Sequence, residues 1–402
     1  MVPDEPAHFY RAWEISQGKL FTDRLPSGAY GSRLPAAVAD CFDRTGRIIY
    51  GETVERAYPN TAMYSFVCYL PQAAGILMAR LFTDRTEVIF YAGRMMNFLT
   101  AFALSTFSIA RIPFGKKILF VIMLFPMTLQ EMISMAPDAL LNSASFAYIA
   151  CVLNVAYRKE KIGRKDIMVL ALLLTVICLT KIAYLGAVLL VYLIPAHKMR
   201  KCELLLLRVI IPSTVILLNL LQLSVASKIL METDYGFSSG TGFRGAASKI
   251  QEKFILSHPV MYIGVMLNTI IHRGPGYIGM CVGMLFSWVG SKTEIRLPFA
   301  IPLLFLLICL YTTASGRCDF KLRKRDTVLF LLCFVSGCTL ILTSEYVSWT
   351  PLCAKIVEGV HGKYFIPVVP CLLMSVFYLL HRQNIKHRGG YLVRPLRSRS
   401  LL

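Results

Sequence analysis

Residues 138–157 read DALLNSASFAYIACVLNVAY, an apolar run whose one charged side chain, Asp138, stands at its first position. About 20 consecutive apolar residues cross the hydrocarbon core of a bilayer as an α-helix. Apolar runs of this kind recur from residue 87 to residue 381. The 402-residue chain is 56% hydrophobic and 16% charged, whereas soluble domains are roughly 25% charged. The sequence therefore predicts an all-α polytopic membrane protein.

Further apolar segments have lengths that suit a bilayer. We expect spans at about 87–110, 116–135, 138–157, 204–230, 297–314, 327–345 and 364–381, with a short pair at 166–180 and 183–196. Segment 61–81 is apolar but interrupted by Pro71 and Gln72, which favours an interfacial or re-entrant helix. Residues 249–272 and 274–290 fit either interfacial helices or a hairpin of two spans. The expected fold is a bundle of about 9–11 transmembrane helices with juxtamembrane helices on its outer face.

Positive charge is concentrated between the apolar segments. The net charge is +20, and about half of the 43 Lys and Arg residues lie in five stretches, namely 111–117, 158–166, 197–203, 316–326 and 382–402. Basic loops stay on the cytoplasmic side of a membrane. We therefore expect a multi-pass protein of the cell (inner or plasma) membrane, with residues 1–86 outside, a transmembrane bundle at 87–381 and a basic cytoplasmic tail at 382–402. The basic residues are not interleaved with aromatic ones, so nucleic acid is not an expected partner.

Residues 3–11, PDEPAHFYR, place two adjacent carboxylates, an imidazole, a phenol and a guanidinium in nine positions. Proline disfavours the helical conformation of the residue before it, so Pro6 predicts an extended Glu5 and a helix that runs from about Pro6 to Gly18. Adjacent carboxylates repel each other, and one of them can have a raised pKa. Such a carboxyl suits a general base or a metal ligand.

The predicted topology gathers other polar residues at the outer ends of the spans. Glu131 and Asp138 flank one outer turn, Lys181 lies at the next, and His361, Lys363 and Tyr364 precede the last span. Ionisable side chains at membrane depth are costly and usually functional. We therefore expect these groups to meet the N-terminal acids on the outer face. The 12 cysteines show no CxxC or zinc spacing, so we expect neither a structural disulfide nor a zinc site.

Four stretches carry a resemblance to a known family. They are PDEPAHF at 3–9, APDALLN at 136–142, TKIAY at 180–184 and GVHGKYFIP at 359–367. In this order they resemble motifs of the bacterial membrane proteins of the domain-of-unknown-function 2142 family, which is similar to the GT-C glycosyltransferases. Tyr58-Pro59 together with residues 69–72 resembles the segment that lies flat on the outer face of GT-C enzymes. The resemblance implies a GT-C-like bundle.

Two features depart from that family pattern. Lys363 stands where the pattern has Arg, which keeps the charge but loses the planar fork that binds phosphate through two hydrogen bonds. GT-C proteins also have a spanning helix before the acidic loop, whereas this chain begins almost at the acids. We expect that first span either to be encoded upstream of Met1 or to have been lost.

The resemblance implies transfer of a sugar from a polyprenyl-phosphate donor to a cell-envelope glycan or lipid acceptor at the outer face. A base must take the acceptor proton, with Asp4 as first choice and Glu5 as second. Cations must stabilise the departing lipid phosphate, and the candidates are Lys181, Lys363 and Arg11. Asp138 could orient the acceptor or hold a divalent cation together with Asp4. His8 could orient a carboxylate, and Tyr364 could stack on the sugar.

Two other classes of function stay open at this point. A secondary transporter would need internal repeats and charges near the bilayer midplane, and the sequence shows neither. A non-catalytic or decayed membrane assembly protein would explain the missing first span. The arrangement of the charged residues separates these alternatives, because only an enzyme of this kind needs Asp4, Asp138, Lys181 and Lys363 in one cleft.

Overall fold

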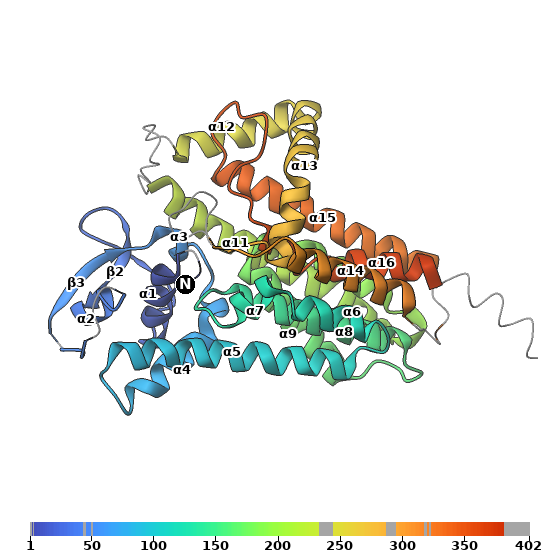
Figure 1. Ribbon diagram of the computed structural model, residues 1–402, viewed down its shortest axis with the longest axis horizontal. Coiled ribbons are helices and arrows are strands. Elements are labelled where there is room, and N and C mark those ends of the chain that lie inside the picture. The colour runs from blue at the N-terminus through green and yellow to red at the C-terminus, as the bar shows by residue number, and fades with distance from the viewer. Residues whose placement is uncertain are drawn as a thin grey trace, which may run out of the picture.

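The chain is mostly helical in a computed structural model, which describes residues 2, 4–42, 46–49, 51–232, 244–286, 295–316, 320 and 323–381 (Figure 1). Sixteen α-helices occur within these residues, and this confirms the predicted helical class. Two small sheets, of three and two strands, were not predicted. The expected basic tail at 382–402 lies outside the described residues.

The N-terminal region forms a compact layer at one end of the molecule (Figure 1). Its elements are α1 (Glu5–Ser16), β1 (Asp23–Arg24), β2 (Tyr30–Pro35), α2 (Ala36–Ala39), β3 (Thr53–Ala57), α3 (Pro59–Ala62), η1 (Phe66–Tyr69) and α4 (Leu70–Arg80). The strands pair antiparallel in the order β1-β2-β3. Phe9 and Trp13 of α1 are buried with Ile76 of α4 and Phe90 of the following helix, α5 (Thr86–Arg111), so an apolar core joins this layer to that helix.

The helical bundle follows from residue 86. Its elements are α5 (Thr86–Arg111), α6 (Lys116–Met123), α7 (Pro126–Met132), α8 (Asp138–Tyr157), α9 (Arg164–Thr180), η2 (Ile182–Leu193), η3 (Ala196–Lys198), α10 (Lys201–Leu205), η4 (Leu206–Ile210), α11 (Ile211–Glu232), α12 (Arg244–Ser257), α13 (Pro259–Val282), β4 (Leu285–Phe286), β5 (Ile295–Arg296), α14 (Ala300–Ser315), α15 (Lys324–Ser348), η5 (Gly362–Phe365) and α16 (Val369–His381). The expected span 116–135 is divided into α6 and α7, because Phe125 is extended (ψ 133°) before Pro126.

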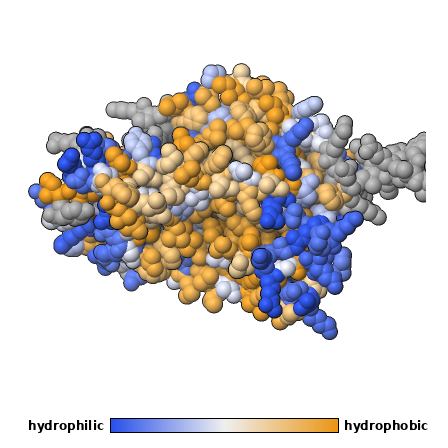
Figure 2. All heavy atoms as spheres, turned by 90° about the horizontal axis from the view of Figure 1, so that it is seen from below, coloured by the Kyte–Doolittle hydropathy of each residue, from blue (hydrophilic) through white to orange (hydrophobic). Residues whose placement is uncertain are grey.

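Four helices among the described residues are long and apolar enough to cross a membrane: Thr86–Arg111, Asp138–Tyr157, Lys201–Ile229 and Lys324–Ser348. The helices Ile182–Leu193, Ala300–Ser315 and Val369–His381 are apolar but shorter, and the α12–α13 pair bends by 110° as a broken span or re-entrant loop would. Helix α8 is 94% buried, against 33% for α5 and 28% for α15, so α8 is the centre of the bundle. Figure 2 shows apolar side chains covering the middle of one face between two hydrophilic ends.

The basic loops meet at the carboxyl end of α8. Arg158 pairs with Asp166, the Lys198 ammonium donates to the carbonyl oxygens of Val155 and Ala156, and the Arg323 guanidinium lies 5.3 Å from the Tyr157 ring. Asp138, at the opposite end of this 20-residue helix, is therefore about 30 Å away at 1.5 Å per residue. That distance equals the thickness of a bilayer's hydrocarbon core.

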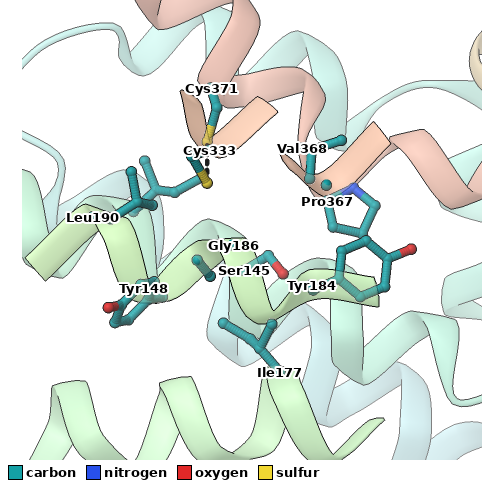
Figure 3. A pocket seen from close by; sticks show the side chains of 13 residues that line it. Ser145, Tyr148, Ile177, Tyr184, Gly186, Leu190, Cys333, Pro367, Val368 and Cys371 are labelled. Atoms are coloured by element: carbon teal, nitrogen blue, oxygen red, sulfur yellow. Dashed lines mark hydrogen bonds between the residues drawn. The ribbon is translucent and has the colours of Figure 1, made fainter. Parts of the chain in front are cut away.

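A small cavity lies inside the bundle between α8, η2 and α15 (Figure 3). Its volume is about 20 Å³, which is room for roughly one water. The Cys333 and Cys371 sulfurs on its wall are 3.7 Å apart, and both are free thiols. We assign this cavity to imperfect packing and place no ligand in it.

Candidate functional site

The turn before α8 is held by buried polar side chains from the N-terminal layer and α5. The Gln72 amide donates to the carbonyl oxygen of Met135 at 3.2 Å, and the Asn97 amide donates to that of Ser134 at 2.8 Å. Both side chains are fully buried. A buried hydrogen-bonded turn of this kind is rigid, so it fixes the end of α7 and the start of α8 relative to each other.

Glu131, on the last turn of α7, and Asp138, on the first turn of α8, project from this turn into a cluster of charges. The Lys181 Nζ lies 2.8 Å from Asp138 Oδ1, and the Lys363 Nζ lies 3.3 Å from Asp138 Oδ2 and 3.2 Å from Glu131 Oε1. The side chains of Lys363, Asp138 and Glu131 are only 8%, 7% and 1% exposed. One carboxylate therefore joins two ammonium groups from distant parts of the chain.

Each lysine is positioned by an irregular backbone segment. Lys181 is extended (φ −150°, ψ 125°) between α9 and η2. Lys363 lies in η5, which packs so closely on α13 that a Cβ on Gly362 would lie 2.5 Å from the Cys281 amide nitrogen. Burial disfavours a charged lysine, but the Asp138 and Glu131 carboxylates outweigh it and raise the pKa of Lys363. Lys363 is therefore a permanent cation.

Aromatic rings surround the Lys181 ammonium. Its Nζ lies 4.4 Å from the centre of the Tyr364 ring and 5.8 Å from that of the Tyr64 ring. The Tyr184 hydroxyl donates to the Tyr364 carbonyl oxygen at 2.8 Å and so holds η5 against η2. The face of the Tyr364 ring thus stabilises the Lys181 ammonium by a cation–π interaction.

These groups line a cavity of about 80 Å³. Its walls are formed by Asp4, His8, Asn60, Thr61, Met63, Tyr64, Asp138, Lys181, Glu345, Trp349, Gly359, His361, Lys363 and Tyr364. Six of the eight residues that the sequence analysis selected are on this list, namely Asp4, His8, Asp138, Lys181, Lys363 and Tyr364. The lining residues come from the N-terminal layer, from α8, from the α9–η2 turn, from the carboxyl end of α15 and from the segment that includes η5.

Asp4, the N-cap residue of α1, lines the cavity. Its backbone is in the left-handed region (φ 58°, ψ 17°), which is uncommon for a residue other than glycine, although aspartate tolerates it better than most. Loss of water around the carboxyl raises the pKa of Asp4 above its usual range, against the Lys363 charge and the Asn60 hydrogen bond, which lower it. A raised pKa suits a proton acceptor.

His8 lies one turn further along α1. Its Nδ1 is hydrogen-bonded with the Tyr69 hydroxyl at 2.7 Å. Burial, helped by the Lys363 charge, lowers the pKa of His8 to about 3. His8 is therefore neutral at physiological pH and contributes shape and a hydrogen bond rather than charge.

Glu5 and Arg11 do not line this cavity. The Glu5 carboxylate accepts hydrogen bonds from Arg94 Nε at 2.8 Å and from the Met135 amide at 3.0 Å, so it joins α1 to α5 and to the turn before α8. Arg11 pairs with Glu14 at 2.6 Å and lines a separate cavity of about 220 Å³. Both are engaged in contacts that hold the fold together.

Several lining residues were not selected from the sequence. Tyr64, Trp349 and Glu345 belong to this group. Glu131, which the sequence analysis expected on the outer face, does not line the cavity but pairs with Lys363. Glu345 is the last residue of the predicted span 327–345, so the rule that ionisable groups in apolar helices are functional would have found it. Tyr64 and Trp349 had no comparable signal, because aromatic residues are common at the ends of membrane helices.

A divalent cation, which the sequence analysis left open, would need oxygen ligands that are free to bind it. Both Asp138 oxygens are already paired with lysines, one with Lys181 and one with Lys363. No group of three or more His, Cys, Asp or Glu side chains among the described residues could hold a metal ion. Asp4 and Asp138 therefore do not form a metal site in this arrangement.

Comparison with known proteins identifies the family. The family model described as "Predicted membrane protein (DUF2142)" matches residues 40–372. The chain belongs to the DUF2142 family. The match includes Asp138, Lys181, Glu345 and Lys363, while the acidic motif at 3–9 precedes it. No curated protein and no solved structure matches this DUF2142 chain. The family resemblance drawn from the four motifs is thereby confirmed, and the likeness to GT-C enzymes stays a prediction.

Proposed function

We propose that this DUF2142 protein transfers a sugar from a polyprenyl-phosphate donor to an acceptor hydroxyl, on the side of the membrane opposite its basic loops. The observation that carries the proposal is that Lys181 and Lys363 share Asp138 in a single cavity that Asp4 also lines. Cations beside a carboxyl of raised pKa are what displacement of a lipid phosphate requires.

The two ammonium groups would hold the phosphate of the donor. A lysine has three N–H donors. Lys181 gives one to Asp138, and Lys363 gives one each to Asp138 and Glu131. Three donors therefore remain between them for phosphate oxygens. The acidic partners hold the lysines in place before the donor binds, so little rearrangement is needed when charge develops on the phosphate.

Asp4 would act on the acceptor. Its carboxylate takes the proton of the acceptor hydroxyl as that oxygen attacks the anomeric carbon. The bond from the anomeric carbon to the phosphate oxygen breaks at the same time, and its electron pair leaves with the phosphate beside Lys181 and Lys363. A single displacement of this kind inverts the configuration of the anomeric carbon.

The position of the cavity suits a substrate that is anchored in lipid. Asp138 stands at one end of α8, about 30 Å from the end where the basic loops meet. A phosphate at that end would lie at the bilayer surface, with its polyprenyl chain beside the short helices α9 and η2. A secondary transporter would instead gather its charges near the middle of the bundle.

The experiment is a transfer assay in membranes that contain the full-length protein, with radiolabelled polyprenyl-phosphate sugars as donors. We expect Asp4→Asn to lower transfer at least about 100-fold, which is the usual effect of losing a general base. Asparagine also tolerates the left-handed backbone of this position, so the fold should be kept. The matched control is Asp23→Asn, because the Asp23 side chain is 68% exposed.

Equal transfer by wild type and Asp4→Asn would exclude Asp4 as the base. Loss of transfer in Asp23→Asn as well would show that the effect is not specific to the cavity. Unfolding temperatures of both variants, measured in detergent, separate a lost base from a lost fold.

A further inference from the structure

Glu345 differs from Asp138 and Glu131, the two acids of the charge cluster. Asp138 and Glu131 each lie within 3.3 Å of a lysine ammonium. The Glu345 side chain lines the same cavity, and the described residues offer it neither an ion pair nor a hydrogen bond. Because α15 is one of the helices that could cross a membrane, an ionisable side chain near its end, with no partner among the described residues, points to a ligand in the cavity.

The carboxyl is held in place by the loop that follows α15. Gly359 has φ +80°, and a Cβ at this position would lie 2.9 Å from Glu345 Oε2 and 2.7 Å from Trp349 Cβ. The Thr350 hydroxyl fastens this loop, since it donates to the Glu345 carbonyl oxygen at 3.1 Å and accepts from the Glu358 amide at 3.0 Å. The loop therefore leaves the Glu345 carboxyl little room to move away from the cavity.

Trp349 lies one helical turn after Glu345 and lines the same cavity. An indole ring presents a large apolar face with specific geometry. A carboxylate beside such a face is suited to a sugar ring, whose hydroxyls donate hydrogen bonds and whose C–H groups pack on aromatic surface.

We propose that Glu345 binds the sugar of the donor by accepting hydrogen bonds from two adjacent hydroxyls, with the ring against Trp349. This inference rests on the proposed function. The substrate class is then a polyhydroxy sugar with two neighbouring free hydroxyls on the side that faces Glu345.

The test compares two lipids that differ only in the sugar. Purified full-length protein in nanodiscs is titrated with polyprenyl phosphate and with polyprenyl-phosphate glucose, and binding is measured by native mass spectrometry. We expect Glu345→Ala to weaken binding of the glucose lipid about 10- to 100-fold, the loss of a hydrogen-bonded charge, and to leave polyprenyl phosphate binding unchanged.

Glu345→Gln keeps the shape of the side chain and provides the test if the alanine variant does not fold. Glu358→Gln is the matched control, because Glu358 is exposed and adjoins the same loop, and it should bind both lipids as wild type does. The inference is overturned if the Glu345 variants bind the glucose lipid normally or lose both lipids equally. A separate variant, Lys181→Ala, should weaken both lipids, and its failure to do so would refute the proposed function without bearing on the sugar contact.

Discussion

Replacing Lys363 with methionine removes a cation from between two buried carboxylates and keeps a side chain of similar length. The Lys363 ammonium lies 3.2 Å from Glu131 and 3.3 Å from Asp138. At an effective dielectric constant of about 20, each contact corresponds to roughly 5 kcal/mol of attraction, most of which offsets the loss of hydration. Breaking a buried pair by removing one partner costs about 3–5 kcal/mol, because the remaining charge is left without compensation.

The expected result is a fall of about 6–10 °C in the unfolding temperature of Lys363→Met, at roughly 2 °C per kcal/mol for a chain of this size. The assay is thermal unfolding in detergent, followed by tryptophan fluorescence or by the exposure of buried thiols. The double variant Lys363→Met/Glu131→Gln should recover about 1–3 kcal/mol relative to the sum of the single variants, because the uncompensated charge is then removed.

The matched control is Lys19→Met. Lys19 pairs with Asp23 at 3.0 Å, but the two side chains are 55% and 68% exposed, so the change should cost less than about 1 kcal/mol. A Lys363→Met variant that is as stable as Lys19→Met would refute the inference that the cavity contains a tightly coupled charge cluster.

Two further predictions concern residues around the cavity. Burial lowers the pKa of His8 to about 3, so below about pH 6.5 the unfolded chain binds a proton that the folded chain does not, and stability should fall by roughly 1.4 kcal/mol per pH unit toward pH 4. His8→Gln should show a shallower fall of unfolding temperature over this range, and an equal slope in both proteins would contradict the burial of a neutral imidazole. Gly359→Ala should lower stability by at least about 1–2 kcal/mol, because its φ of +80° disfavours a Cβ that would also meet Trp349. The measurement is chemical denaturation of Gly359→Ala and of a helical control, Gly264→Ala, at which a Cβ has no neighbour within 4 Å. Equal free energies of unfolding for the two variants would refute the prediction.

The different roles of the adjacent acids Asp4 and Glu5 could not be predicted from the sequence. Both were candidate bases, because two neighbouring carboxylates look alike in a sequence. The left-handed backbone of Asp4 leaves its carboxyl on the cavity, while Glu5 enters α1 and pairs with Arg94, 89 residues further along the chain. Only the packing of α1 on α5 distinguishes them.

The N-terminal sheet was missed for a related reason. Strands β2 and β3 are short, and their facing residues Arg33 and Glu55 are partly exposed, so neither strand has a marked apolar pattern. Their pairing is decided by contacts between segments about 20 residues apart. The division of the expected span 116–135 at Pro126, in contrast, was open to prediction from the proline itself.

Hydropathy and the spacing of basic residues determined the class of this protein, its mostly helical structure and the positions of most helices. Both are local properties of the chain, because a run of apolar residues needs lipid or a bundle core wherever it occurs. The tertiary structure alone decided which charges meet: Lys181 is 43 residues from Asp138, and Lys363 is 232 residues from Glu131. An ion pair depends on the distance between two atoms, and that distance is set by how the helices pack rather than by either residue's neighbours in the sequence.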